Sequence, residues 1–326
     1  MRTLTHCFLA AILSMPLAAT AGGIVLAVHG GAGAIPRAEL TAEKEASIRA
    51  DIEAALRAGA KALADGGSSL DAVTRAVVLL EDSPHFNAGK GAVFNAAGVN
   101  ELDASIMDGA TRRAGAVAGL HRIGNPVELA RAVMEKSVHV MMIGEGAEQF
   151  AQSVGIAFVE PGYFRTESRW QELLKAREAA KKQASLPSSA YYGTVGAVAR
   201  DAQGRLAAAT STGGMTNKRF GRVGDAPIIG AGTWADSGCA VSATGWGEYF
   251  IRSAVAHDIC ARVAYRGDSV AKAAADVLVE VARLGGDGGV IVLDAAGNAA
   301  LPYNSGGMYR GTIDADGAVV VAIYTE

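Results

Sequence analysis

The chain has 326 residues, of which 50% are hydrophobic, 6% are aromatic and 41 are glycine, and its formal net charge is −3. This length and apolar fraction can bury a large core, in one large domain or two small ones, and the apolar runs between the glycines predict tight turns rather than disorder. The small negative charge excludes the basic surface that binds nucleic acid or an anionic membrane.

The first segment, residues 1–21, has the features of an export signal. Arg2 precedes a short apolar run, and Ala19–Thr20–Ala21 has the small-x-small form of a cleavage site. A membrane anchor is the alternative, but the run is too short to span and Pro16 interrupts it. We expect a protein exported with cleavage before Gly22, which is periplasmic if the organism is Gram-negative. No further membrane-spanning segment is expected after residue 21.

The chain up to residue 160 predicts alternating strands and helices. The apolar run at 24–28 is typical of a buried strand and ends in the loop His29–Gly33. Helices are expected at 40–64, from Ser68–Ser69 to 80, from Asn125–Pro126 onward and at 145–154. Short strands are expected at 92–95, 101–108, 114–120 and 139–143.

Residues 161–193 are charged and then rich in Ser and Pro, which predicts an exposed helix followed by a flexible tether. Beyond the tether, strands are expected at 194–199, 206–210, 288–294 and 298–302, and helices at 250–265 and 269–284. Periodicity alone therefore predicts α and β elements in layers.

The bond between Gly193 and Thr194 stands where the tether meets a strand. A threonine hydroxyl is a weak nucleophile without a base, and breaking this bond would free an α-amine on the same residue. That amine has a pKa of roughly 7.7–8.0, close to what a general base needs. A random threonine is usually an ordinary strand residue, but Gly193 tolerates a strained bond and an apolar strand would hold Thr194 rigidly.

Segments in a fixed order along the chain resemble the plant-type asparaginase/isoaspartyl peptidase family of N-terminal nucleophile (Ntn) hydrolases. They are HGGAGAI (29–35), LEDSPHFNAGKGAVFN (80–95), ELDASIMDG (101–109), GTVGAVARD (193–201), STGGMTNK (211–218), GRVGDAPIIGAGTWAD (221–236) and TGWGEYFIR (244–252). The resemblance runs from residue 29 almost to the C-terminus. It implies an α+β fold, a four-layer αββα sandwich, and self-cleavage into an α subunit (22–193) and a β subunit (194–326).

The resemblance also implies a set of site residues. Thr194 is the nucleophile and Thr212 its hydrogen-bond partner, although a turn threonine that satisfies its own backbone is the ordinary alternative. Thr244 and Gly245 supply an oxyanion hole, where a helix N-cap is the alternative. Arg222 and Asp225 bind the substrate's α-carboxylate and α-amine, with Gly247 lining the same pocket, where a surface ion pair is the alternative.

The loop at 80–90 resembles the family's sodium loop. Its main-chain carbonyl ligands would come from Leu80, Glu81, Ser83, Phe86, Ala88 and Lys90. The ion would be structural, and the chemistry needs no cofactor. His29 is expected to be a packed, hydrogen-bonded histidine rather than a catalytic base.

Cysteine use leaves two possibilities. Cys7 leaves with the signal, while Cys239 and Cys260 either pair in an oxidising compartment or are buried as small apolar residues.

The resemblance implies hydrolysis of β-aspartyl dipeptides and L-asparagine by a dimer of αβ units (α2β2). One alternative is the related glycosylasparaginase branch, which cleaves GlcNAc–Asn, although STGGMTNK fits the peptidase branch better. Another is a non-catalytic periplasmic amino-acid-binding protein, which would remain one uncut chain.

Overall fold

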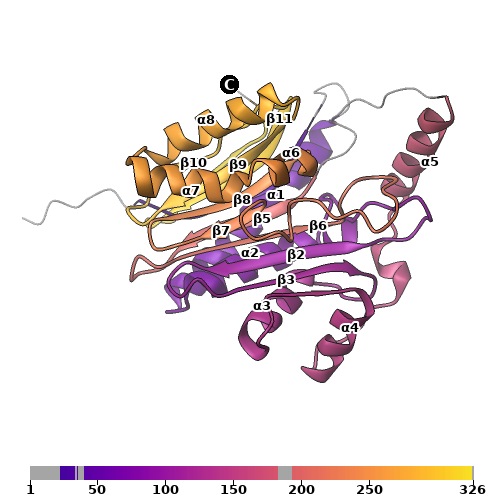
Figure 1. The fold of residues 1–326 in the computed structure, drawn as a ribbon, viewed down its shortest axis with the longest axis horizontal. Coiled ribbons are helices and arrows are strands. Elements are labelled where there is room, and N and C mark those ends of the chain that lie inside the picture. Colours follow the sequence, from indigo (N-terminus) through magenta and orange to yellow (C-terminus); the bar gives the residue numbers. More distant parts are fainter. Residues whose placement is uncertain (1–22, 34, 36–39, 183–192, 325–326) are drawn as a thin grey trace, which may run out of the picture.

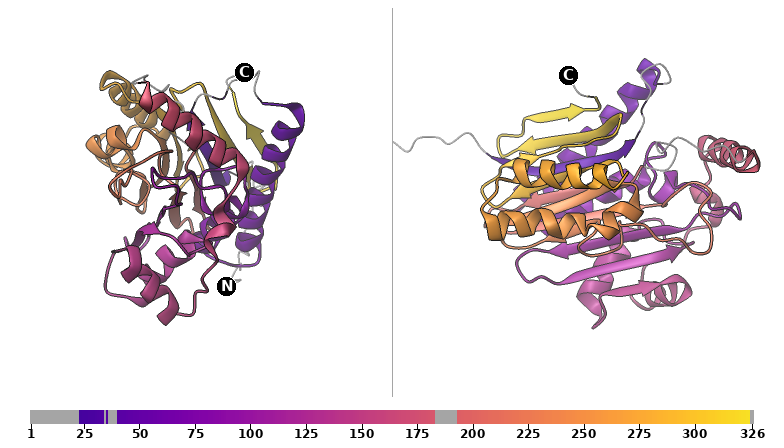
Figure 2. Two further views of the ribbon diagram at one scale, coloured as in Figure 1. Left: turned by 90° about the vertical axis from the view of Figure 1, so that its right-hand side faces the viewer. Right: turned by 45° about the horizontal axis from the view of Figure 1, so that its top comes forward.

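A computed structural model describes residues 23–33, 35, 40–182 and 193–324. In these residues the strands form two sheets that lie face to face, as Figure 1 and the two views of Figure 2 show. The segment 1–22, which contains the expected signal peptide, lies outside the described residues, as does the tether at 183–192.

The larger sheet has eight strands in the order β12-β11-β1-β5-β6-β2-β3-β4. Their bounds are β1 Ile24–Gly33, β2 Leu102–Asp108, β3 Ala114–Leu120, β4 Met141–Ile143, β5 Val195–Arg200, β6 Leu206–Thr212, β11 Gly307–Asp314 and β12 Val319–Ala322. All neighbours are antiparallel except β3 and β4. In this sheet β1, from before the tether, lies between β11 and β5, and β6, from after it, pairs with β2, so cleavage at residue 193 would leave two intertwined chains.

The smaller sheet has four antiparallel strands in the order β10-β9-β8-β7. Their bounds are β7 Thr233–Ala235, β8 Cys239–Gly245, β9 Gly288–Asp294 and β10 Ala299–Ala300. Its inner face contacts β1, β2, β5 and β6 of the larger sheet.

Helices cover the outer face of each sheet. The larger sheet carries α1 Ala42–Ala64, α2 Ser69–Asp82, α3 Pro126–Lys136 and α4 Gly144–Ser153, and the smaller sheet carries α6 Gly247–Arg252, α7 Val255–Arg266 and α8 Val270–Arg283. Local signals start these helices: Ser68 forms a capping box with Asp71, and Pro126 is in the first turn of α3. The expected four-layer αββα sandwich is confirmed.

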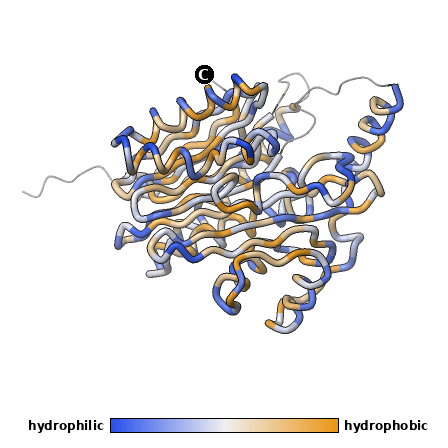
Figure 3. Tube along the Cα trace, viewed as in Figure 1, coloured by the Kyte–Doolittle hydropathy of each residue, from blue (hydrophilic) through white to orange (hydrophobic). Residues whose placement is uncertain are grey.

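Three apolar clusters hold the layers together. Two lie between a sheet and its helices, and the third lies between the sheets. Figure 3 shows hydrophobic residues along the strands of both sheets, with hydrophilic residues recurring on α7 and α8. The sheets are therefore buried on both faces, which explains why their strands read as nearly continuous apolar runs.

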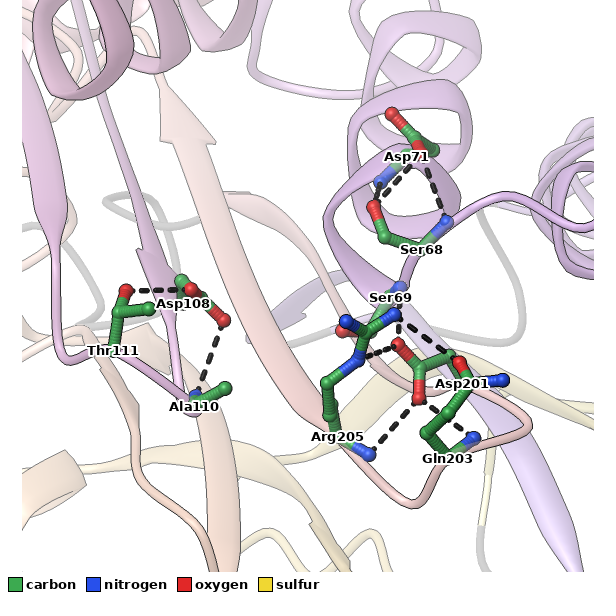
Figure 4. A network of polar contacts seen from close by, with 9 residues as sticks. All are labelled: Ser68, Ser69, Asp71, Asp108, Ala110, Thr111, Asp201, Gln203 and Arg205. Atoms are coloured by element: carbon green, nitrogen blue, oxygen red, sulfur yellow. Dashed lines mark hydrogen bonds and ion pairs between the residues drawn. The ribbon is translucent and has the colours of Figure 1, made fainter.

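Two hairpin turns close the sheet at the end away from Thr194. In Figure 4, Asp201 accepts from the backbone of Gln203 and from Arg205 Nε at 2.8 Å, and it also meets the backbone N–H of Ser69 at 3.4 Å. Asp108 likewise caps the β2–β3 turn through Thr111 and the backbone of Ala110. These contacts fix the registers of β5 with β6 and β2 with β3.

Two expected elements are wrong. Residues 92–95 form no strand, because side chains bond to their backbone groups instead. Asn87 accepts from the N–H of Val93, and Asn100 donates to the carbonyls of Ala92 and Val93. Phe94 forms a single β-bridge, with Asn100. The helix expected at 250–265 is two helices, α6 and α7, broken at Ala254, where φ is 45°. The first amides of α7 bond to the carbonyls of Gly230 and Ala231 instead, so a tertiary contact replaces the helical bonds.

The segment before the tether contains the short η2 (Pro161–Phe164) and the exposed α5 (Glu167–Lys181), as expected. Figure 1 shows α5 extending away from the sandwich. Among the described residues, no helix is both long and apolar enough to cross a membrane.

Candidate active site

Thr194 lies immediately before β5, at the end of the large sheet opposite the two capped turns. Its hydroxyl donates to Thr212 Oγ1 at 3.1 Å, and its side chain is only 7% exposed. Thr212 ends the neighbouring strand β6, and its oxygen also accepts from the backbone N–H of Gly214 at 2.9 Å. Thr212 therefore satisfies its own turn and contacts Thr194 at once, so its two sequence-based interpretations do not exclude each other.

The Gly193–Thr194 bond is held between two backbone segments. The carbonyl oxygen of Gly193 accepts from the backbone N–H of Asn87 at 3.1 Å. A Cβ at Gly193 would lie 2.8 Å from the Asn87 side chain, and one at Gly31 would lie 2.6 Å from Gly193 Cα. Only glycine fits at both positions, because real Cβ atoms do not come this close to their neighbours.

Asn87 was not singled out by sequence reasoning, although its position in NAGKG is the signal that could have found it. Its side chain bridges two segments, donating to the carbonyl of Gly214 at 2.7 Å and accepting from the N–H of Val93 at 2.9 Å. It thereby orients its own backbone N–H toward the carbonyl of Gly193.

His29, on β1, is fully buried and hydrogen-bonded, as the sequence led us to expect. Its Nδ1 lies 3.0 Å from the Thr194 carbonyl and its Nε2 lies 2.8 Å from Ser242 Oγ. Burial lowers the pKa of the imidazole to about 3, despite the opposing effect of the Thr194 bond. The ring is therefore neutral, and since a carbonyl only accepts, Nδ1 carries the proton.

Thr244 and Gly245 end β8. Thr244 is fully buried and accepts from the backbone N–H of Ala32 at 3.3 Å. Because Gly31, the residue before Ala32, contacts Gly193, Thr244 lies close to the scissile bond. It does not cap a helix: the N-cap of α6 is Trp246, with no side-chain cap bond. The capping alternative for Thr244 is thus excluded.

Arg222, Asp225 and Gly247 converge. A Cβ at Gly247 would lie 2.8 Å from Arg222 Nη2 and 3.0 Å from Asp225 Oδ1, so a glycine there leaves room for both groups. Asp225 is 4% exposed, and its Oδ2 has no hydrogen-bond partner among the described residues. Burial raises the pKa of this carboxyl to about 7, with Arg222 acting in the opposite direction. A buried carboxylate oxygen without a partner is a binding position for a cation.

Glu248 was missed by sequence reasoning. Its carboxylate accepts two parallel hydrogen bonds from Arg222, from Nε to Oε1 at 2.9 Å and from Nη2 to Oε2 at 2.7 Å. This pair orients the guanidinium, and despite burial it raises the Arg222 pKa. Its signal in the sequence is weak, because an acidic residue in the first turn of a helix is common for its interaction with the helix dipole alone.

The loop expected to hold sodium runs from the end of α2 to the short helix η1 (Gly89–Gly91). A Cβ at Gly89 would lie 2.3 Å from the Glu81 carbonyl oxygen, and one at Gly91 would lie 2.1 Å from that of Phe86. The carbonyl oxygens of Glu81 and Phe86 therefore lie close to the backbone of Gly89 and Gly91. Two polar side chains of the loop have partners outside it: His85 Nδ1 lies 2.8 Å from Asp51 Oδ2, and Lys90 lies over the Tyr163 ring. Main-chain carbonyl oxygens are the ligand type that a hard monovalent cation prefers.

Cys239 on β8 and Cys260 on α7 form a disulfide, so the first of the two cysteine possibilities holds. Among the described residues no cluster of His, Cys, Asp and Glu has the arrangement of a metal site.

A threonine at the head of a strand in an αββα sandwich, with a convergent Arg–Asp pocket, defines an Ntn-type hydrolase. Residues 22–323 match the asparaginase family Asparaginase_2, and the chain belongs to that family. It is 52% identical to the isoaspartyl peptidase of Salmonella typhimurium (93% of this chain, 99% of the relative) and 51% identical to that of Escherichia coli (94% and 97%). It is also 43% identical to the isoaspartyl peptidase/L-asparaginase of Mus musculus (87% and 86%).

Proposed function

We propose that this protein is a self-cleaving isoaspartyl peptidase and L-asparaginase that uses Thr194 as its nucleophile. The observation that carries the proposal is the hydrogen bond from the Thr194 hydroxyl to Thr212, beside a Gly193 carbonyl that Asn87 already holds. The family membership and the names of the bacterial and mouse relatives support the same activity.

In the precursor, Thr194 Oγ1 attacks the carbonyl carbon of Gly193. The oxygen of that carbonyl becomes negative, and the Asn87 N–H already points at it. The C–N bond breaks, the amine of Thr194 takes the proton, and water hydrolyses the resulting ester. The products are the α subunit (22–193) and the β subunit (194–326).

In the mature enzyme the free amine of Thr194 accepts the proton of its own hydroxyl. The hydroxyl attacks the side-chain carbonyl of asparagine or the β-aspartyl carbonyl of a dipeptide. The Thr244 hydroxyl and the Gly245 N–H stabilise the oxyanion. Ammonia or an amino acid leaves with the proton, and water then releases aspartate from the β-aspartyl ester. No cofactor takes part.

The Arg222–Asp225 pocket matches the invariant end of these substrates. Arg222 binds the α-carboxylate, and the unpaired Oδ2 of Asp225 binds the α-ammonium beside Gly247. The experiment is electrophoresis and N-terminal sequencing of purified protein, followed by assays with β-Asp-Leu and with a GlcNAc–Asn conjugate. Two bands, the smaller beginning at Thr194, and hydrolysis of β-Asp-Leu are expected.

Each other outcome favours an alternative. Turnover of only the GlcNAc–Asn conjugate would indicate a glycosylasparaginase. A single chain that binds an amino acid without turnover would indicate a non-catalytic binding protein. Full-length protein that stays intact yet active would exclude self-cleavage as the source of the nucleophile.

Three further proposals accompany the activity. The first is export with cleavage before Gly22, supported by a family match that begins at residue 22, and by a disulfide; periplasmic fractionation and N-terminal sequencing test it.

The second is a structural Na⁺ bound by the carbonyls of the 80–90 loop; thermal stability in NaCl against choline chloride tests it. The third is a dimer of αβ units, which light scattering tests.

A further inference from the structure

A row of buried polar side chains crosses the layer between the two sheets, one register step behind Thr194. In the larger sheet, His29, Gly196, Thr210 and Ser105 are direct cross-strand neighbours on β1, β5, β6 and β2. Opposite them in the smaller sheet, Thr233 and Ser242 are neighbours on β7 and β8. The five side chains His29, Ser105, Thr210, Thr233 and Ser242 are all fully buried.

These side chains form one continuous chain that crosses between the sheets at every step. His29 Nε2 meets Ser242 Oγ at 2.8 Å, Ser242 meets Thr210 at 2.7 Å, and Thr210 meets Thr233 at 2.5 Å. Ser105 is the donor both to Thr233 at 2.8 Å and to the carbonyl of Ala226 at 2.6 Å, so its one hydrogen is shared between the two. At the other end, His29 Nδ1 meets the carbonyl of Thr194.

The neutral histidine fixes the direction of the protons. Since Nδ1 donates to Thr194, Nε2 can only accept, and Ser242 must donate to it. Ser242 then accepts from Thr210, which accepts from Thr233. Thr210 also donates to the carbonyl of Gly232 at 3.1 Å, so its one hydrogen is shared between that oxygen and Ser242. Thr233 thus donates to Thr210, Thr210 to Ser242 and Ser242 to His29, whose Nδ1 donates to the carbonyl of Thr194.

Gly196 makes room for the chain. A Cβ there would lie 1.9 Å from Ser242 Oγ and 2.6 Å from His29 Nε2, so any side chain would displace the bond between them. This explains the second glycine of GTVG, which the cleavage chemistry does not require.

We propose that this chain, His29–Ser242–Thr210–Thr233–Ser105, is a positioning device that fixes the Thr194 main chain relative to the loop that carries Asp225. Its two ends support this: one holds the carbonyl of Thr194, and the other holds the carbonyl of Ala226, the residue after Asp225. The inference rests on the proposed roles of Thr194 and Asp225. The chain touches no reacting atom, so it acts by orientation alone.

The test is steady-state kinetics on β-Asp-Leu with Thr210→Val, Ser242→Ala and the double variant, all after complete self-cleavage. Each single variant should lower kcat roughly 10- to 100-fold with KM within about twofold, since a displacement of about 1 Å at a reacting group costs on the order of 10²-fold. The double variant should have a kcat no lower than that of the more impaired single variant, because one broken hydrogen bond already separates Thr194 from the carbonyl of Ala226.

Two controls separate positioning from general destabilisation. Thr210→Ser retains the hydroxyl and should recover most of the lost kcat. Thr74→Val removes a buried hydroxyl that donates to the Leu70 carbonyl within α2, away from the chain, and should leave kcat unchanged. If Thr210→Val does not yield folded protein, Ser105→Ala at the far end carries the same test, with a lowered kcat expected.

Wild-type kcat in Thr210→Val or Ser105→Ala, or losses that multiply in the double variant, would overturn the proposal. These outcomes differ from failure of the proposed function itself. In that case the wild type would not hydrolyse β-Asp-Leu, or Thr194→Ala would remain active, whatever the chain variants do.

Discussion

The layer between the sheets has two halves that differ in chemistry although they share the same strands. The half further from Thr194 is an apolar row, which lies two residues along each strand from the polar chain. Its members in the larger sheet are Ala27, Val198, Ala208 and Met107, and those in the smaller sheet are Ala235, Ala240 and Leu293. The next row toward the site is the polar chain from His29 to Ser105, and beyond it lie Thr194, Thr212 and Thr244.

Both halves are built on the same strands, with a register shift of β1 between His29 and Gly31 in the polar half. Small apolar side chains fill the first half, and apolar side chains of matched volume would cost nothing in desolvation if they filled the second. The apolar half therefore supplies stability. The polar half costs desolvation free energy, and its hydrogen bonds orient the groups around Thr194.

The largest expected effect is on Thr194. Thr194→Ala should give an uncut chain with no measurable turnover, because both reactions use the same hydroxyl. Its melting temperature should stay close to that of the uncut wild-type chain, since only one buried hydroxyl is lost. Electrophoresis, the β-Asp-Leu assay and calorimetry check this, and residual turnover in an uncut sample would contradict it.

A substitution in the apolar half should lower stability and leave catalysis nearly unchanged. Leu293→Ala leaves a cavity between the sheets and should lower the free energy of unfolding by about 2–5 kcal/mol. Its kcat should remain within about twofold of wild type at a temperature where it is folded. Stability is best measured in the Thr194→Ala background, where a single chain unfolds. A large loss of kcat without a loss of stability would break the division between the halves.

Thr244→Ala tests the polar half at a residue outside the chain from His29 to Ser105. Loss of one oxyanion donor typically costs ~10²–10³ in kcat, and KM should change little, because the charge appears only in the transition state. Thr244→Ser retains the hydroxyl and should be much less impaired. If Thr244→Ala raised KM and left kcat intact, the oxyanion role would be wrong.

Part of this division is visible in the sequence, because side chains on a strand alternate between faces. Thr210 and Thr212 follow Leu206 and Ala208 at spacing two, so the change from apolar to polar on the inner face of β6 is visible in LAAATST. The Arg222–Asp225 pair and the packed His29 were predicted too, because each depends on a short motif.

The features of the fold and the site that were not predicted depend on contacts between segments far apart in the sequence. Ser242 and Thr233 look like ordinary strand residues until β7 and β8 lie over β6, and Glu248 looks like a dipole-favouring helix residue until Arg222 reaches it. The strands β7, β8, β11 and β12 were not predicted, and β7 and β12 are only three and four residues long. The break at Ala254 depends on carbonyls of a loop more than twenty residues earlier.

Arg222→Lys should have a smaller effect, confined to binding. Lysine keeps the charge but not the two-pronged geometry, and hydrogen bonds between charged groups are worth about 1.5–3 kcal/mol, so KM for β-Asp-Leu should rise about tenfold or more. The α-carboxylate does not change during the reaction, so kcat should be nearly preserved. Self-cleavage should proceed, because the precursor presents no carboxylate there. A wild-type KM with a lowered kcat would rule out the clamp.

The smallest expected effect is a pH dependence of KM that arises in the same pocket. Burial raises the pKa of Asp225 to about 7, so its neutral form persists to a higher pH than that of an exposed carboxyl. As the pH falls through this value, Asp225 loses the charge that attracts the substrate ammonium. KM should therefore rise about fourfold between pH 8 and pH 6.5 for a group of that pKa.

The fall in kcat over the same range has a separate origin, in protonation of the Thr194 amine, so the two constants must be determined separately at each pH. Asp225→Asn is the matched control: it should bind weakly at every pH and show no such slope in KM. A KM that stays flat in wild type while kcat falls would assign the whole pH dependence to the nucleophile. Asp225 would then be either ionised throughout the range or not in contact with the ammonium.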